Sequence, residues 1–292
     1  MAYTKAEFRG PSFSAKELSE RWDRTVSDSD HFRQTAPTVT DLHYRRVVRN
    51  LLRRWLPHPE GLRVLKLDLY NEATGTPHTG YFMERQARVI GVDISFKITC
   101  QAARKCGAQV AAVQGDVRTL PLRTGSIDII FSLGTLEHVQ DADQPAVLAE
   151  LFRVLKPGGT CLLGVNNRHS LWLTPLLFEW LEYTGVIRHQ WSYEPTYPPS
   201  HLRRLFRRAG FQAIRGDGTL LFPKWLRAYD LWSAARPGPV FAVANAVKRV
   251  LYAPIMWTIE RLESWGPLNY FADQTLTGGI KPRVAPERRD VE

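Results

Sequence analysis

The sequence predicts an α/β fold in which helices cover both faces of a doubly wound, mostly parallel sheet. Apolar runs with strand character alternate with amphipathic helical stretches at the spacing of βαβ units. The first run, Arg63–Leu69, is short, apolar and unbroken, which is typical of a central parallel strand. Seven strands are expected, at residues 63–69, 88–95, 108–116, 126–133, 160–166, 211–218 and 275–283.

The elements before the third strand follow from capping and turn residues. Residues 1–40 are polar with scattered aromatic side chains, and we expect them to form an N-terminal cap or lid. Asp41 is the expected N-cap of the first strong helix, which should end near Leu56 because prolines follow. After the first strand, we expect a loop at Asn71–Gly80 and a short helix over residues 81–87.

Turn residues also place the later helices. A helix is expected at Phe96–Cys106, and Gly107 suits the position just after its end. Pro145 suits the first turn of a helix that runs to Leu155, and we expect Pro157-Gly158-Gly159 to end it. A basic helix is expected at residues 200–209. The resulting division is a cap at 1–40, a core at 41–221 with an apolar insert at 170–191, an aromatic helical insert at 222–272, a last core strand at 273–283 and a flexible tail at 284–292.

Composition limits the class of protein. The chain has 292 residues, a hydrophobic fraction of 44% and a net charge of +10. Arginines gather in two helical stretches, Tyr44–Leu56 and Leu202–Arg208, which are either solvated faces or contacts for phosphate or lipid headgroups. The three cysteines match no metal spacing and indicate reduced thiols. Without a charged-then-apolar leader or a long uncharged apolar run, we expect a cytoplasmic protein, with peripheral membrane contact left open.

Two acids follow neighbouring strands at the positions where open α/β sheets bind ligands. Asp93 ends the second strand and could accept both ribose hydroxyls of a nucleoside. Asp116 follows the third strand and could accept the amino group of adenine. The second acid favours S-adenosylmethionine over a dinucleotide.

Four motifs occur in sequence between about Val89 and Asn166: GVDIS, QGDVRTLPL, SIDIIFSLGTLEHV and LFRVLKPGG. Their order resembles the class I S-adenosylmethionine-dependent methyltransferases of the type 11 kind, which implies a Rossmann-like methyltransferase fold. The resemblance implies that Asp93 binds ribose and Asp116 the adenine amine. It also implies that Val117 flanks the ring and that Leu133 lies near the cofactor.

The end of the first strand departs from that family. The segment reads KLDLYNEATG, with Lys66 where the pattern has an acid and Asp68, Tyr70 and Glu72 where it has glycines. Glycines there let the backbone approach the cofactor. In one interpretation, Asp68, Asn71 and Glu72 attract the ammonium and sulfonium charges of the cofactor, and Lys66 pairs with its carboxylate. In the other, the loop has lost cofactor affinity and the protein is a non-catalytic relative.

Methyl transfer needs an aligned acceptor and, for acceptors that hold their proton tightly, a base. His138 beside Glu137 is the first candidate base and His169 the second, although both positions also suit structural histidines. Asn166 and Arg168 are placed to bind an acceptor. The histidine spacing indicates no metal site.

The inserts at 170–191 and 222–272 are rich in Trp, Leu and Phe, with Arg and Lys at intervals. Segment Val240–Trp265 is too interrupted to span a bilayer, so it lies in a membrane interface, caps the domain or joins two subunits of a homodimer. We therefore expect methyl transfer to a small or lipid-like molecule, at a membrane surface in one version. A nucleic-acid methyltransferase is the weaker alternative, because the chain has no RNA-binding module and no motif for a flipped base.

Overall fold

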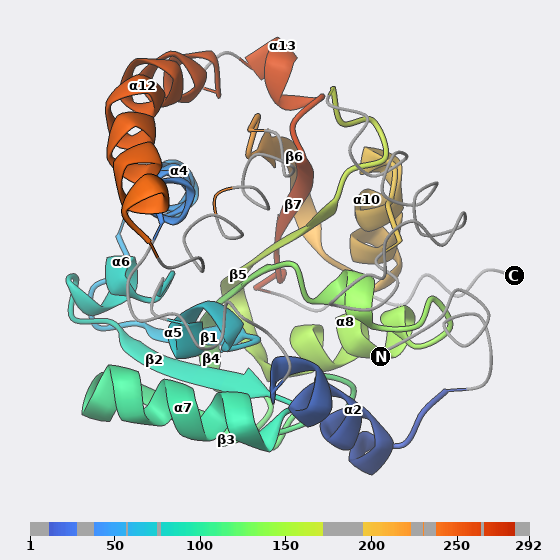
Figure 1. The fold of residues 1–292 in the computed structure, drawn as a ribbon. Coiled ribbons are helices and arrows are strands. Elements are labelled where there is room, and N and C mark those ends of the chain that lie inside the picture. Colours follow the sequence, from blue (N-terminus) through green and yellow to red (C-terminus); the bar gives the residue numbers. More distant parts are fainter. Residues whose placement is uncertain are drawn as a thin grey trace, which may run out of the picture.

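The computed structural model describes residues 12–27, 38–56, 58–74, 77–171, 195–222, 230, 238–263 and 266–283. Strands and helices alternate along most of this chain (Figure 1). The strands are β1 Arg63–Leu67, β2 Arg88–Asp93, β3 Val110–Gln114, β4 Ile127–Leu133, β5 Leu155–Asn166, β6 Gln212–Thr219 and β7 Gln274–Ile280. The α-helices are α2 Ala15–Ser27, α4 Val39–Trp55, α5 Tyr70–Thr74, α6 Gly80–Met83, α7 Phe96–Cys106, α8 Gln144–Val154, α10 Pro199–Arg208, α12 Pro239–Glu263 and α13 Gly266–Asn269.

The sheet has seven strands in the order β3-β2-β1-β4-β5-β7-β6. The first five strands of this order pair in parallel, and β7 runs antiparallel to both β5 and β6. The predicted doubly wound α/β fold is thereby confirmed. The chain reverses its winding direction between β1 and β4, and in open sheets such a switch point opens the crevice that binds ligands.

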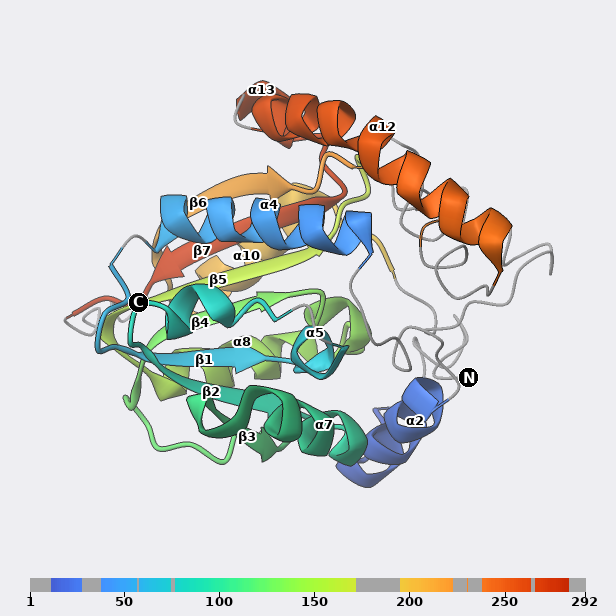
Figure 2. The same ribbon diagram turned by 60° about the vertical axis from the view of Figure 1, so that its left-hand side comes forward.

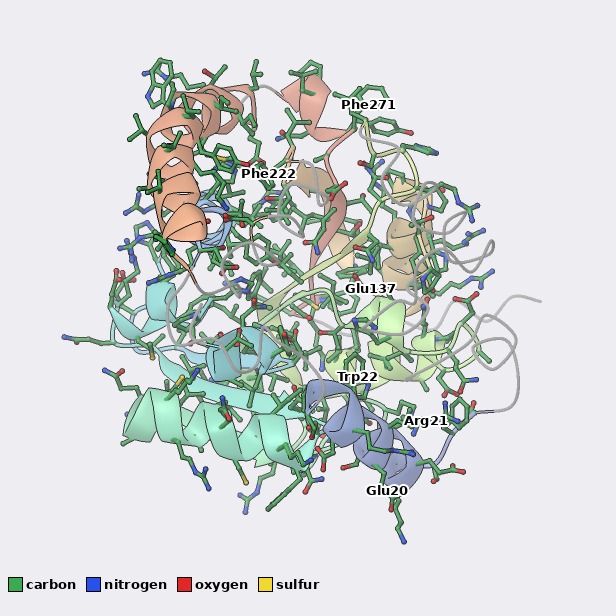
Figure 3. All side chains as sticks on the ribbon, viewed as in Figure 1. Glu20, Arg21, Trp22, Glu137, Phe222 and Phe271 are labelled. Carbon is green, nitrogen blue, oxygen red and sulfur yellow. The ribbon has the colours of Figure 1, made fainter. Side chains whose placement is uncertain are left out.

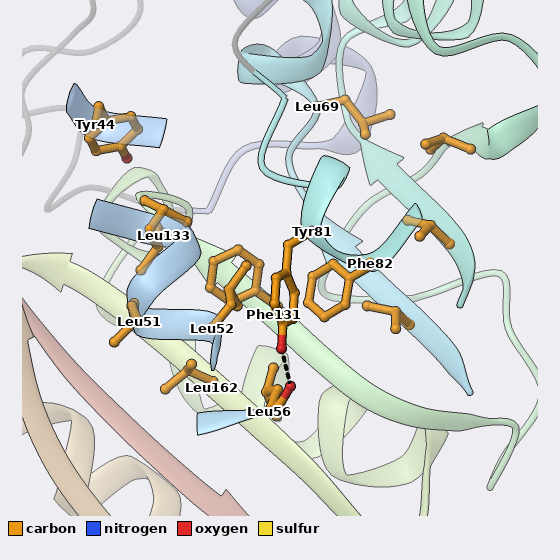
Figure 4. Packing of buried hydrophobic residues seen from close by; sticks show 14 of the residues in the cluster. Tyr44, Leu51, Leu52, Leu56, Leu69, Tyr81, Phe82, Phe131, Leu133 and Leu162 are labelled. Atoms are coloured by element: carbon orange, nitrogen blue, oxygen red, sulfur yellow. Dashed lines mark hydrogen bonds between the residues drawn. The ribbon is translucent and has the colours of Figure 1, made fainter. Parts of the chain in front are cut away.

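Helices cover both faces of the sheet (Figure 2). One buried cluster joins α4, α6 and α7 to one face, and a second joins α8 and α10 to the other. Strand β1 shows the alternation that this requires, because Val64 belongs to the first cluster while Leu65 and Leu67 belong to the second. Figure 4 shows the first cluster, in which the Tyr81 hydroxyl donates to the carbonyl oxygen of Leu56 at 2.7 Å.

The start of α4 differs from the prediction that Asp41 is its N-cap. Thr38 is the N-cap, and its hydroxyl accepts from the backbone N–H of Asp41 at 3.1 Å. The Asp41 carboxylate in turn accepts from the backbone N–H of Thr38 at 3.0 Å. The acid therefore completes a capping box from the third helical position, where it satisfies a different backbone donor.

Two further boundaries were predicted wrongly. The short helix α5, Tyr70–Thr74, overlaps the first part of the expected loop at Asn71–Gly80, and two residues separate it from the end of β1. Pro157-Gly158-Gly159 does not end α8, which stops at Val154; these residues lie inside β5, which begins at Leu155. A Cβ on Gly159 would lie 2.9 Å from the carbonyl oxygen of Asp128, so glycine allows β5 to approach β4 closely.

The predicted inserts are described only in part. From the insert at 170–191, residues 172–191 lie outside the described residues, as does the tail from residue 284. Within 222–272 the structure describes α12 and α13. Helix α12 packs against α4 on the side away from the sheet, which makes it an outer layer (Figure 2).

Candidate functional site

The carboxyl end of β1 is built around a buried lysine. The Lys66 side chain is fully buried on the same face of β1 as Val64, and its ammonium lies 6.0 Å from the centre of the Phe131 ring. Its Nζ donates to the carbonyl oxygens of Leu67 at 2.6 Å and Asp68 at 2.8 Å, and to the Asp68 carboxylate at 3.0 Å. An ammonium carries three donors, and these acceptors use all of them.

Burial destabilises the charged form of Lys66, but nearby carboxylates stabilise it more strongly. Desolvation on its own lowers the pKa of this ammonium. The carboxylates of Asp68, Glu72 and Asp93 act in the opposite direction, so the pKa of Lys66 is raised. The lysine is therefore a fixed positive charge at the strand end.

Asp68 links this charge to the loop after β4. Its backbone has a φ of +53°, a left-handed conformation that favours glycine, although the residue here is an aspartate. One carboxylate oxygen accepts from Lys66 and from the Thr135 hydroxyl at 2.9 Å. The other accepts from the backbone N–H of Tyr70 at 3.3 Å. About a fifth of the side chain, 19%, stays exposed.

Glu72 and Asn71 lie on α5 and are both buried. The Glu72 carboxylate accepts from the backbone N–H groups of His78 at 3.0 Å and Thr79 at 3.1 Å, which ties α5 to the start of α6. Burial raises the pKa of this carboxyl, and Lys66 opposes the shift. Glu72 thus fixes the position of the segment between α5 and α6.

Asp93 ends β2 and holds two neighbouring segments together. One carboxylate oxygen accepts from the backbone N–H of Leu69 at 2.7 Å, and the other from that of Ser95 at 2.8 Å. Burial raises the pKa of Asp93 to about 7, although both hydrogen bonds favour the charged form. The end of β1 and the end of β2 therefore meet at this carboxyl.

Asp116 lies just beyond β3 and is clamped by Arg118. The guanidinium donates to the Asp116 carboxylate at 2.6 and 2.9 Å, and another of its nitrogens donates to Asp143 at 2.9 Å. These carboxylates raise the pKa of Arg118 further. Val117 is half-buried and packs against the second cluster, and Leu133 is buried in the first.

His138 lies in the turn after β4 and is covered by α2. The Trp22 ring meets the His138 ring edge-on, with centroids 4.9 Å apart. Figure 3 shows Trp22 on the side of α2 that faces the core, whereas Glu20 lies on the opposite side. Helix α2 also reaches the end of β2, because the Asp23 carboxylate accepts from the Ser95 hydroxyl and from the backbone N–H of Lys97.

The residues after β5 divide into buried and exposed groups. Asn166 is buried, and its carbonyl oxygen accepts from the backbone N–H of Tyr197 at 2.9 Å. Arg168 is exposed. His169 lies beside Tyr270, with its Nδ1 2.7 Å from the phenol oxygen. These residues come from the β5 side of the sheet edge, while His138 comes from β4.

Thr135 and Arg118 contribute to this edge but were not singled out from the sequence, whereas α2 lies within residues 1–40, which were expected to form a cap or lid. Thr135 binds Asp68, Arg118 clamps Asp116, and α2 lies across the ends of β2, β3 and β4 through contacts to Ser95, Gln114 and His138. The pairing of Arg118 with Asp116 could have been predicted, because the two residues are only two positions apart. The contact between Asp23 of α2 and Ser95 joins residues 72 positions apart, and no local sequence pattern indicates it.

Within the described ranges, no group of three or more His, Cys, Asp or Glu side chains is arranged to hold a metal ion. In the same part of the chain, no helix is both long and apolar enough to cross a membrane.

Comparison with known proteins extends these observations. Residues 74–163 match the family model described as a methyltransferase domain, so the match begins just after the altered segment at the end of β1. The chain is 44% identical over 87 residues to an uncharacterised 37.1 kDa protein of transposon Tn4556 from Streptomyces fradiae, which covers 29% of this chain and 24% of that protein. It is 30% identical over 145 residues to demethylmenaquinone methyltransferase of Lactococcus lactis, covering 44% of this chain and 57% of that enzyme. The chain thus spans less than two thirds of the length of these relatives.

Solved structures share the whole fold at low identity. Phosphoethanolamine N-methyltransferase 2 of Haemonchus contortus, in complex with S-adenosyl-L-methionine, has a TM-score of 0.57 at 16% identity, over 93% of this chain and 61% of that one. The [4+2]-cyclase SpnF has a TM-score of 0.57 at 13% identity, over 94% and 98%. Residues 74–163 thus match a methyltransferase domain, and the observed strand order and these likenesses show the fold of the S-adenosylmethionine-dependent methyltransferases.

Proposed function

We propose that this protein transfers a methyl group from S-adenosylmethionine to a small or lipid-like acceptor. The observation that supports this most is the row of carboxylates at one edge of the sheet. Asp68, Asp93 and Asp116 follow the adjacent strands β1, β2 and β3. Parallel strands bring their carboxyl ends to one edge, and ligands of open α/β sheets bind there.

The adenosine half would be held by Asp93 and Asp116. Each Asp93 oxygen accepts one backbone N–H, and a carboxylate oxygen can accept a second donor, so a ribose hydroxyl can be added without loss of the existing bonds. Each Asp116 oxygen already accepts two donors from Arg118, so Asp116 would accept the adenine amine in place of one of these bonds. Val117 would flank the ring and Leu133 would lie below it.

The methionine half would be held by the substituted loop. Asp68 is the best placed direct partner for the ammonium group, because part of its carboxylate is exposed. Asn71 is a second polar candidate. We assign Lys66 and Glu72 a positioning role instead of direct contact. The three donors of Lys66 are all used within the chain, and the Glu72 side chain is buried, with one carboxylate oxygen accepting from two backbone N–H groups. Lys66 would have to release one of its acceptors to reach a cofactor carboxylate.

His138 is the preferred base and His169 the second candidate. His138 comes from the turn between β4 and α8, on the cofactor side of the edge, and α2 would act as a lid over it through Trp22. Asn166 and Arg168 would contact the acceptor from the β5 side. The acceptor must lie between these groups and the methyl donor. The arrangement therefore suits in-line attack of the acceptor atom on the methyl group.

Titration calorimetry with S-adenosylmethionine and S-adenosylhomocysteine is the first test. Binding at micromolar to millimolar concentrations is expected, and no binding at millimolar cofactor would favour the non-catalytic relative. Fold likeness does not decide between them, since the fold also occurs in a [4+2]-cyclase. Strongly salt-dependent RNA binding would favour the nucleic-acid alternative.

Once an acceptor is found, His138→Gln tests the base. We expect kcat to fall roughly a hundredfold or more, with cofactor affinity unchanged, because a general base contributes on the order of 10²–10⁴ in rate. An equal loss of cofactor binding would indicate that His138 supports the site structurally.

A further inference from the structure

Among the described side chains of helix α12, several large hydrophobic ones are exposed while two charged ones are buried. A helix on the surface of a globular protein normally buries its apolar stripe and exposes charge. Lys248, Met256 and Glu263 are the most buried of the α12 side chains that the structure describes, with exposures of 8%, 1% and 6%. The large hydrophobic side chains of this helix that stay exposed are Val243, Val247, Val250, Leu251, Ile255, Trp257 and Leu262.

The inward side is held by polar contacts. Lys248 forms an ion pair with the buried Asp230 at 2.8 Å, and the other oxygen of Asp230 accepts from the backbone N–H and hydroxyl of Thr40 at 3.0 and 2.9 Å. Glu260 lies 3.2 Å from His43 and 3.1 Å from Arg46. These bonds attach α12 to α4 in one orientation, and that orientation turns the apolar side chains outward.

The outward side forms a continuous stripe, which we call the α12 apolar face, comprising the seven exposed hydrophobic residues named above. Val250 and Leu251 are 73% and 58% exposed at its middle. From Val243 to Leu262 the face extends over about 29 Å at 1.5 Å per residue. Exposed apolar patches of this size mark interaction sites, because leaving them in water is unfavourable.

Positive charge accompanies this face. The Arg261 guanidinium lies over the Trp257 ring at 4.4 Å, and Arg46 on the neighbouring α4 is 60% exposed. Arg45 is exposed on the same helix. A second copy would present the same apolar side chains and arginines, so it offers no opposite charge to them from this face. An anionic lipid surface instead accepts both the apolar side chains and the arginines.

We propose that the α12 apolar face docks on an anionic lipid bilayer surface, with α12 lying in the interface plane and Trp257 and Arg261 near the headgroups. This inference rests on the proposed function in the case of a lipid-like acceptor. It adds which surface of the protein would contact the membrane. The enzyme would then encounter a lipid-like acceptor at the membrane that contains it. The test below measures lipid binding alone, so its failure is distinguishable from failure of cofactor binding.

The experiment is flotation of the full chain with vesicles of phosphatidylcholine, with and without phosphatidylglycerol. We expect the wild type to float with anionic vesicles at low salt and less so at high salt. The double variant Val250→Glu/Leu251→Glu should partition at least about tenfold less, because two buried apolar side chains are lost and negative charge is added.

The single variants Val250→Glu and Phe96→Glu form the matched pair, because Phe96 is 57% exposed on α7 and each variant adds one negative charge at an exposed apolar residue; the Phe96 variant is the control. It should float like the wild type. Circular dichroism and urea denaturation verify that each variant is folded. The proposal is overturned if the wild type stays in the bottom fraction with anionic vesicles, or if the double variant floats equally well. It is also overturned if the wild type is a dimer without lipid binding and the double variant is a monomer, since a second copy would then cover the face.

Discussion

The end of β1 carries an unusual residue for its position. A lysine points into the aromatic side of the core, and its charge is compensated by two carbonyl oxygens and one carboxylate. The arrangement replaces a glycine-rich loop by side chains that bind the backbone from within. Asp68 has a left-handed backbone, with a φ of +53°, which a glycine adopts more readily.

The Lys66–Asp68 pair can be measured with a double-mutant cycle of Lys66→Met and Asp68→Asn. Lys66→Met alone should lower the free energy of unfolding by about 3–5 kcal/mol, because it leaves buried acceptors without their donor. The double variant should lose less than the sum of the two single variants. Urea denaturation measures all four proteins. Additive effects within about 0.5 kcal/mol would show that the two charges are not coupled.

Asp93 gives the cofactor site a pH dependence. Its pKa is raised to about 7 by burial, and ribose hydroxyls would bind the charged form. Below that pH the carboxyl must lose a proton before it binds, so affinity for S-adenosylhomocysteine should fall about tenfold per pH unit. Calorimetry between about pH 5 and pH 8 checks this. Asp93→Asn should bind weakly at every pH, and a wild-type affinity independent of pH would contradict the role given to Asp93.

At the scale of elements, α2 connects the strand ends that the sheet brings together. It contacts residues beyond β2, β3 and β4, and its Asp23 carboxylate binds the turn that directly follows Asp93. Any ligand between these strand ends and α2 would be enclosed by both. The predicted role of residues 1–40 as a cap or lid is compatible with these contacts.

Asp23→Ala tests that role. It removes an acceptor of the Ser95 hydroxyl and the Lys97 backbone N–H, and should weaken S-adenosylhomocysteine binding roughly tenfold, because bonds to a charged group contribute about 1.5–3 kcal/mol. Glu20→Ala on the outer side of the same helix is the control and should leave the dissociation constant unchanged. Equal effects of the two variants would mean that α2 does not close over the ligand.

For the molecule as a whole, buried carboxyls set how stability varies with pH. Glu263 at the end of α12 accepts from the backbone N–H of Leu221, and burial raises its pKa to about 7. In the unfolded chain a glutamate titrates near its ordinary pKa of about 4.3. Between these values the unfolded state loses the proton while the folded state keeps it. The stabilisation is therefore complete below about pH 4 and is lost as pH rises through about 7.

Glu263→Gln cannot titrate and should remove this dependence. Between about pH 4 and pH 8, the difference in unfolding free energy between wild type and variant should change by roughly 3 kcal/mol, with the wild type relatively more stable at the acid end. Urea denaturation at both pH values measures it. The exposed Glu20→Gln serves as control. A difference that does not vary with pH would show that Glu263 titrates normally.

Much of the fold was predictable because its causes are local. Helix α7 at Phe96–Cys106 has the predicted bounds, since Ser95 caps its start and Gly107, with a φ of +58°, ends it. Apolar runs located every strand of the sheet to within a few residues. The boundaries that were predicted wrongly, at Thr38 and at Leu155, depend on partners that a local pattern does not distinguish.

The sequence by itself determined the order of strands and helices, and with it the placement of Asp93 and Asp116 at strand ends. Periodicity and turn residues act over a few positions, so they can be read along the chain. Tertiary structure alone decided the partners of Lys66, the covering of His138 by α2 and the outward orientation of the α12 apolar face. These depend on contacts between residues far apart in sequence. For example, buried Asp230 binds both Thr40 of α4 and Lys248 of α12, and these bonds fix which side of α12 faces inward.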